Sequence, residues 1–171
     1  RLDDEVRSGG MARGDQVREI GGHEEAARLR ESYQSIQSLT GARFGEAFFE
    51  GVAQRRRRLD SEPPAIALAA FRMLAPERSE LELAHAILRG NFWEGGDPTS
   101  EEFYREIAAR LGLDPDAFVD TMRTQEAKDR AIYDFALARQ LGADAFPRLY
   151  LQTAEDYLHL ISRGYSAFDQ V

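Results

Sequence analysis

The sequence contains no cysteine. Disulfide bonds, cysteine-ligated metals and a sulfur nucleophile are therefore excluded within these 171 residues. No apolar run approaches the roughly 20 residues of a membrane-spanning helix. The chain also lacks the G-x-S-x-G motif, the P-loop and the glycine fingerprint of dinucleotide-binding folds. No familiar motif for serine hydrolysis, nucleotide binding or cysteine catalysis is present inside the chain.

Basic residues are fewer than acidic residues. Lysine and arginine number 22 against 30 aspartate and glutamate residues, which gives a formal net charge of −8. Since phosphate contacts need clustered basic side chains, this balance argues against nucleic acid and anionic membranes as partners. One basic block exists, Gln54-Arg55-Arg56-Arg57-Arg58. We interpret it as a solvated loop face rather than as a site for phosphate or an acidic partner.

Histidine and tryptophan are also rare, with three and one residues. His23 begins a stretch similar to H-E-x-x-H, but Ala27 stands where the second histidine is needed. We interpret His85 and His159, which are isolated in the sequence, as half-buried histidines, and we expect no metal site and no cofactor. Trp93 follows Asn91-Phe92, and we interpret it as a core residue rather than as an exposed lip for a substrate.

What the sequence does contain is mostly helical periodicity. Residues 66–74 are nearly all apolar, which predicts a helix buried on most sides. Ser61, Ser79, Asp114 and Thr124 stand at positions typical of helix N-caps. In the helix that Ser79 begins, we expect Leu81, Ala84, Leu88 and Phe92 to face inward. The predicted helices are 24–39, a short one within 42–59, and 61–75, 79–92, 97–111, 114–123 and 124–141.

Strands are predicted only near the two ends. Residues 1–6 suggest the frayed end of a strand, Gly9-Gly10 a turn or a close backbone approach, and residues 12–22 a loop. At the other end, residues 148–152 and 157–161 predict a β-hairpin with its turn at 153–156, a break at Gly164 and a helix start at Ser166. A two-stranded hairpin is not stable alone, so we expect a further strand, contributed from ahead of Arg1.

The segment Ala145-Phe146-Pro147 lies between the last long helix and this hairpin. Proline cannot donate a ladder hydrogen bond, so the mouth of a strand is a place where it fits. The chain must reverse within residues 143–147, and an aromatic residue precedes the proline. We therefore predict a cis Phe146–Pro147 bond.

Taken in order, these pieces resemble the DsbA-like thioredoxin-fold family, in its protein-disulfide isomerase branch. The matching motifs are Gly9-Gly10-Met11, Ser61-Glu62-Pro63, Phe92-Trp93, Gly112-Leu113-Asp114, Gly142 to Pro147, and Arg163-Gly164-Tyr165. The resemblance covers about 160 residues through the order and spacing of motifs that are individually unspecific. The family's C-x-x-C, which precedes the Gly-Gly segment, is missing, and Arg148 replaces the usual threonine after the cis-proline.

The resemblance implies an α/β, thioredoxin-like fold with a large all-helical insertion and with its N-terminal strand and C-terminal helix cut. Residues 1–23 and 142–171 would belong to the thioredoxin-like core, and residues 24–141 to the helical insertion domain. The implied function is a thiol-disulfide oxidoreductase or isomerase whose C-x-x-C lies outside these residues, so that the 171-residue chain has no catalytic residue and is inactive.

The same resemblance implies that Ala145, Phe146 and Pro147 bind the substrate. Partners would be protein or peptide thiols and disulfides, or glutathione, met in the cytoplasm by a monomer or homodimer. Two alternatives stay open. One is a redox-inactive, peptide-binding adaptor, and the other is a glutathione-dependent isomerase of the 2-hydroxychromene-2-carboxylate isomerase type.

Overall fold

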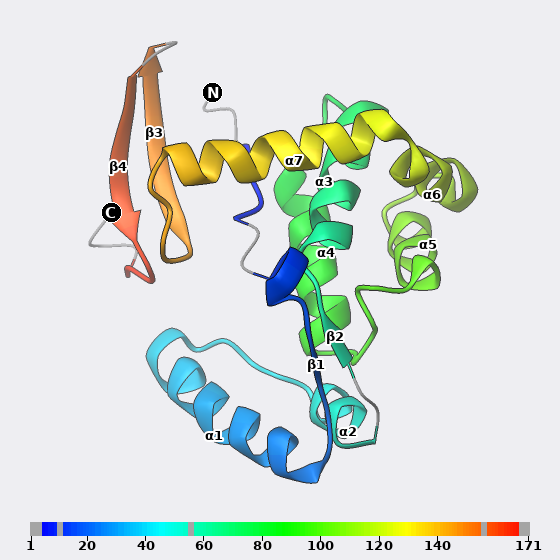
Figure 1. Cartoon of the computed structure of the whole chain (residues 1–171), viewed down its shortest axis with the longest axis vertical. Coiled ribbons are helices and arrows are strands. Elements are labelled where there is room, and N and C mark those ends of the chain that lie inside the picture. The colour runs from blue at the N-terminus through cyan, green and yellow to red at the C-terminus, as the bar shows by residue number, and fades with distance from the viewer. Residues whose placement is uncertain (1–4, 10–11, 55–56, 155–156, 168–171) are drawn as a thin grey trace.

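Helices dominate the computed structural model (Figure 1), which describes residues 5–9, 12–54, 57–154 and 157–167. Each helix predicted between residues 24 and 141 is found, whereas the helix expected to start at Ser166 falls mostly on residues 168–171, which lie outside the described residues. The helices found are α1 (His23–Thr40), α2 (Glu46–Gln54), α3 (Glu62–Leu74), α4 (Glu80–Phe92), α5 (Glu101–Arg110), α6 (Pro115–Arg123) and α7 (Gln125–Gln140). A short 3-10 helix, η1 (Gly14–Gln16), precedes them.

Strands form two separate antiparallel pairs. β3 (Arg148–Ala154) pairs with β4 (Tyr157–Arg163), which confirms the predicted hairpin at slightly greater length. Two residues of its predicted turn, 155 and 156, lie outside the described residues. Within the part of the chain that the structure describes, no third strand joins this hairpin. Residues 5 and 6 are not in a strand, contrary to the expected strand end, whose other four residues are not described.

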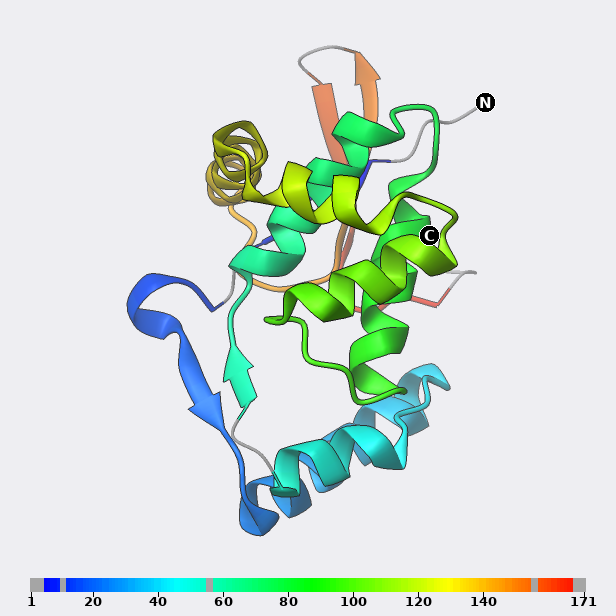
Figure 2. The same ribbon diagram turned by 90° about the vertical axis from the view of Figure 1, so that its right-hand side faces the viewer.

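The second pair was not predicted. β1 (Arg18–Ile20) pairs with β2 (Arg57–Leu59) inside stretches that we expected to be a loop and an exposed basic face. This ribbon links the α1–α2 pair to the other helices (Figures 1 and 2). Each strand has three residues, which is too short for alternating hydrophobicity to be visible in the sequence.

Arg57 corrects the interpretation of the basic block. Its side chain is buried, with 6% of the residue exposed, and its Nη1 donates to Oδ1 of Asn91 at 2.8 Å. Its Nη2 donates to the backbone carbonyl oxygens of Gly95 and Gly96. The arginine thus ties β2 to the end of α4, whereas the neighbouring Arg58 is exposed and pairs with Asp60.

The predicted caps are confirmed at three of four helices. Asp114 accepts from the amides of Asp116 and Ala117, Thr124 from Ala127, and Ser79 from Leu81. Ser61 makes no capping bond to α3, because its hydroxyl instead accepts from the amide of Ala12 at 3.0 Å. This serine therefore fixes the loop that follows the described N-terminal residues.

The main core surrounds α3, whose residues from Ala65 to Phe71 are buried as the sequence predicts. α4 packs on it with a different face from the one expected. Leu83 and Ile87 are buried, while Leu81 and Leu88 are 55% and 56% exposed. Apolar residues occur on both faces of this helix, so their spacing alone could not show which face is buried, and the prediction was wrong.

Other side chains are more exposed than predicted. Trp93 is 45% exposed and is not a core residue, and His85 and His159 are exposed rather than half-buried. The described residues include no cluster of histidine, cysteine, aspartate or glutamate side chains that could hold a metal ion. None of the described helices has the length and hydropathy needed to cross a membrane.

Candidate functional site

The loop between α7 and β3, residues 143–147, is the segment on which the sequence prediction centred, and we call it the proline loop. Its Phe146–Pro147 peptide bond is cis, in agreement with that prediction. Gly142, with φ of 63°, ends α7 in the left-handed conformation that favours glycine. The amide of Gly164 donates to the carbonyl of Pro147 at 2.7 Å, so the base of the hairpin closes on the loop.

Part of this loop is open to solvent. Phe146 is 37% exposed, Pro147 is exposed and Ala145 is half-buried. Among the described residues, no hydrogen-bond partner is found for the backbone of Ala145 or Phe146. The structure therefore places the three predicted site residues together, with an aromatic ring and free backbone groups at the surface.

Asp144, Arg148 and Arg163 form an ion-pair cluster, which we call the clasp, and it joins the proline loop to β3 and β4. The carboxylate of Asp144 accepts from the guanidinium groups of Arg148 and Arg163, and Arg148 also donates to Tyr150 Oη at 3.3 Å. The hydrogen bond from Arg148, followed by that from Arg163, holds the pKa of Asp144 below its usual range. Arg148, which replaces the threonine of the resemblance, thus turns back onto the loop.

Gly9 lies directly against the ring of Phe146. A Cβ atom built at Gly9 would come within 2.7 Å of Cε2 of that ring and overlap its other edge carbons. Only glycine leaves room for the backbone at this point. The close approach expected for the Gly9-Gly10 pair is confirmed for Gly9, while Gly10 lies outside the described residues.

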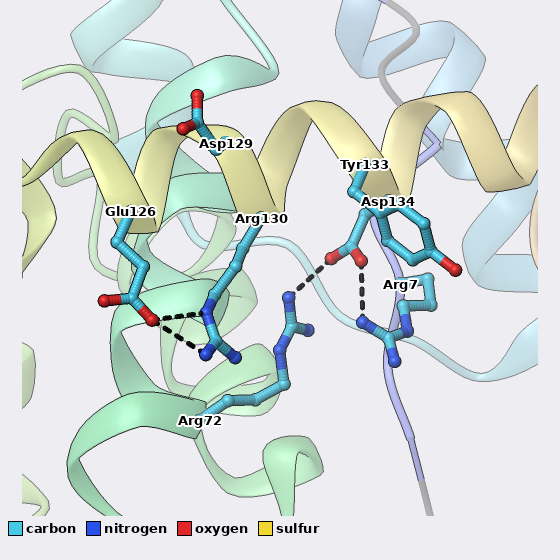
Figure 3. Close-up of a pocket in the computed structure, with 7 residues that line it drawn as sticks. All are labelled: Arg7, Arg72, Glu126, Asp129, Arg130, Tyr133 and Asp134. Atoms are coloured by element: carbon cyan, nitrogen blue, oxygen red, sulfur yellow. Dashed lines mark hydrogen bonds and ion pairs between the residues drawn. The ribbon is translucent and has the colours of Figure 1, made fainter.

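A buried charge cluster holds the segment that brings Gly9 to this position. Asp134, on α7, is fully buried and accepts from Arg7 and Arg72, each at 2.7 Å (Figure 3). Arg72, on α3, also donates to Glu80 at 3.1 Å. The other arginine near this cluster, Arg130, pairs instead with Glu126 on its own helix.

The same cluster pairs with the backbone of the N-terminal segment, residues 5–9. The amide of Val6 donates to Glu80 Oε2 at 3.0 Å, and its carbonyl accepts from Arg72 Nη1 at 3.1 Å. An arginine and a glutamate therefore bind one residue through both of its main-chain groups, as a neighbouring strand would. Sequence reasoning missed this cluster, although a lone arginine in the apolar α3 segment was a usable signal.

Comparison with known structures finds several proteins whose fold is similar to that of this chain. A putative protein disulfide isomerase from Nitrosomonas europaea is similar at 25% identity, with a TM-score of 0.74 over 88% of this chain and 74% of that one. The cytosolic disulfide reductase DsbM from Pseudomonas aeruginosa, solved with GSH, is similar at 25% identity and a TM-score of 0.72, over 92% of this chain and 74% of that one. No protein-family model and no curated protein sequence matches the chain.

The chain has a DsbA-like thioredoxin fold. The similar structures are named as thiol-disulfide enzymes, and this DsbA-like chain itself contains no cysteine. Residues 145–147 are thus partly exposed and include no sulfur nucleophile.

Proposed function

We propose that these residues form the helical and C-terminal part of a DsbA-like thiol-disulfide oxidoreductase or isomerase, whose reactive C-x-x-C lies outside them. The observation that carries the proposal is the contact between Gly9 and Phe146 beside the cis-proline. In the family arrangement, the segment that follows the reactive cysteines leads into this glycine. Its fixed position against the proline loop would bring the cysteines near the loop.

Ala145, Phe146 and Pro147 are proposed to bind the substrate. The backbone groups of Ala145 and Phe146 could pair with an extended peptide in the manner of strand addition, and the exposed ring would contact its side chains. The substrates would be protein or peptide thiols and disulfides, or glutathione. DsbM is named a cytosolic enzyme, which supports a cytoplasmic location for this chain, as a monomer or homodimer.

The chemistry would be thiol-disulfide exchange. A cysteine thiolate, stabilised at a helix N-terminus, attacks one sulfur of a substrate disulfide. That S–S bond breaks as a mixed disulfide forms, and the other substrate sulfur leaves as a thiolate. The second cysteine, as its thiolate, then attacks the sulfur of the first cysteine. This step closes a disulfide between the two cysteines and releases the remaining substrate sulfur as a thiolate, so two electrons pass from the dithiol to the substrate.

The test is an insulin-reduction assay of the protein encoded by the intact reading frame, with glutathione as the reductant. We expect activity that depends on a C-x-x-C ahead of residue 9, and no activity from the cysteine-free 171-residue chain. Phe146→Ala should lower kcat/KM for the disulfide by about tenfold. Tyr157→Ala, at an exposed residue of β4, is the matched control and should leave it unchanged.

Three results would overturn the proposal. One is exchange by the cysteine-free chain, and another is exchange that persists after both cysteines are replaced. The third is a reading frame without C-x-x-C. A serine in place of its first cysteine would favour the glutathione-dependent isomerase. The absence of both cysteine and serine at that position would favour the adaptor.

A further inference from the structure

A concave surface separate from the proline loop lies between α1 and α4, and we call it the aromatic groove. Its volume is about 670 Å³, and its apolar lining comes from Tyr33, Ile36, Phe44, Leu88, Phe92 and Trp93. A groove of this size lies within the roughly 300–1,000 Å³ of sites for small organic ligands. Neither the proline loop nor the buried charge cluster contributes to it.

The floor of the groove is held in place by its neighbours. Tyr33 and Phe44 lie with ring centroids 4.4 Å apart, and Phe44 meets Phe92 edge-on at 5.7 Å. The amide of Gly45 donates to the carbonyl of Phe92 at 2.9 Å, which ties the start of α2 to the end of α4. Ring packing and a backbone hydrogen bond therefore hold the aromatic surface in place without a ligand.

Apolar side chains at the rim remain exposed. Trp93 is 45% exposed, Leu88 is 56% exposed and Ile36 is 41% exposed. These residues come from two helices and converge on one hollow, which distinguishes them from scattered surface hydrophobics. In the part of the chain that the structure describes, no other segment covers them.

The charged residues that line the groove are all basic. Arg43 and Arg89 line it together with His85, and none of the described residues that line it is acidic. This is notable in a chain with 30 acidic residues and a net charge of −8. Arg89 pairs with Glu94, whereas Arg43 has no charged or hydrogen-bonding partner among the described residues. An uncompensated guanidinium next to an apolar hollow attracts a carboxylate or sulfonate group.

We propose that the aromatic groove binds a small amphipathic organic anion. Its apolar or aromatic body would lie between Phe44, Leu88 and Trp93, and its anionic group would pair with Arg43. The charge of Arg43 makes this occupant fit better than a neutral hydrophobic ligand. The proposal is independent of the thiol-disulfide function, because it uses none of the residues of the proline loop.

The test uses 1-anilinonaphthalene-8-sulfonate as an aromatic anion and N-phenyl-1-naphthylamine as its neutral counterpart. Binding is followed by probe fluorescence and by the emission of Trp93, the single tryptophan of the chain. Leu88→Glu places a carboxylate in the groove, and Leu81→Glu makes the same change outside it on the same helix. The two leucines are almost equally exposed, at 56% and 55%, so the variants remove a similar amount of buried apolar surface. The urea midpoint of each variant shows that it is folded before its Kd is compared.

We expect saturable binding of the sulfonate with a change in Trp93 emission. Leu88→Glu should raise its Kd about tenfold, since like charges repel across a binding surface, and Leu81→Glu should not change it. Arg43→Gln should raise the Kd of the sulfonate about three- to fivefold and leave that of the neutral probe unchanged.

Other results would overturn the proposal. Equal Kd values for the Leu88→Glu and Leu81→Glu variants would place the probe elsewhere, for example on the exposed hairpin. An equal rise in the Kd of both probes in Arg43→Gln would contradict the proposed pairing of the anionic group with Arg43. A dimer in sedimentation that Leu88→Glu dissociates would show that a second copy of the chain occupies the groove.

Discussion

Gly9 and Phe146 are in contact, although 137 positions separate them in the sequence. The ring of Phe146 occupies the space that a side chain at position 9 would need. This contact joins the N-terminal segment to the proline loop. Each segment therefore restricts the position of the other.

Gly9→Ala should therefore lower the free energy of unfolding by about 1–3 kcal/mol, the usual cost of overpacking. Phe146→Leu in the same chain reduces the overlap, so Gly9→Ala should cost less in that background. Urea denaturation of the two single variants and the double variant measures this coupling. An equal cost in both backgrounds would contradict the contact.

Asp134→Ala should lower the free energy of unfolding by about 3–5 kcal/mol, because it leaves the guanidinium groups of Arg7 and Arg72 without their shared buried partner. Asp129→Ala, an exposed site on the same helix, is the control and should stay within about 0.5 kcal/mol of the parent chain. Chemical denaturation followed by circular dichroism compares them. Similar values for both variants would contradict a structural role for the buried charges.

Arg57→Lys should lower the free energy of unfolding by about 2 kcal/mol, although the charge is kept. A lysine cannot donate at once to Asn91 and to the carbonyls of the loop that follows α4. The neighbouring change Arg58→Lys, at an exposed arginine, should have no measurable effect. Thermal unfolding of the two variants distinguishes them, and equal melting temperatures would argue against the buried arginine.

The clasp at Asp144 predicts a dependence of stability on pH. Hydrogen bonds from Arg148 and Arg163 lower its pKa in the folded chain, so its contribution to stability is present above its unfolded pKa, near 3.9. That contribution is lost as the pH falls through the lower folded value. Asp144→Asn should therefore flatten the fall in melting temperature below pH 4. An unchanged slope in Asp144→Asn would contradict the clasp.

The elements that the sequence predicted correctly are those whose ends are marked by residues with a local structural role, such as helix caps. Asp114 and Thr124 act as caps through bonds within three residues, so their roles are visible in the sequence. The cis Phe146–Pro147 bond and the hairpin after it are local features of the same kind. In each case the interaction that defines the structure lies within a few positions of the residue that signals it.

Predictions failed where the partner is distant. Ser61 has the sequence context of a cap, but its hydroxyl accepts from Ala12, 49 positions away. Arg57 was read as one of several solvated arginines because nothing nearby reveals Asn91 and the loop that follows it. Leu88 could face either side of α4 by periodicity alone, and packing on α3 decided the outcome. The aromatic groove was missed for this reason.

The bond between Arg7 and Asp134 spans 127 positions, and the two bonds of Val6 span 74 and 66. Contacts of such long range form late in folding, because the chain between them must first be ordered. During synthesis, Asp134 reaches solution only after most of the chain has left the ribosome. Val6 can meet Arg72 and Glu80 before α7 has emerged, but Arg7 gains its partner Asp134 only afterwards. We therefore expect the docking of the N-terminal segment to be completed late in the folding of this chain.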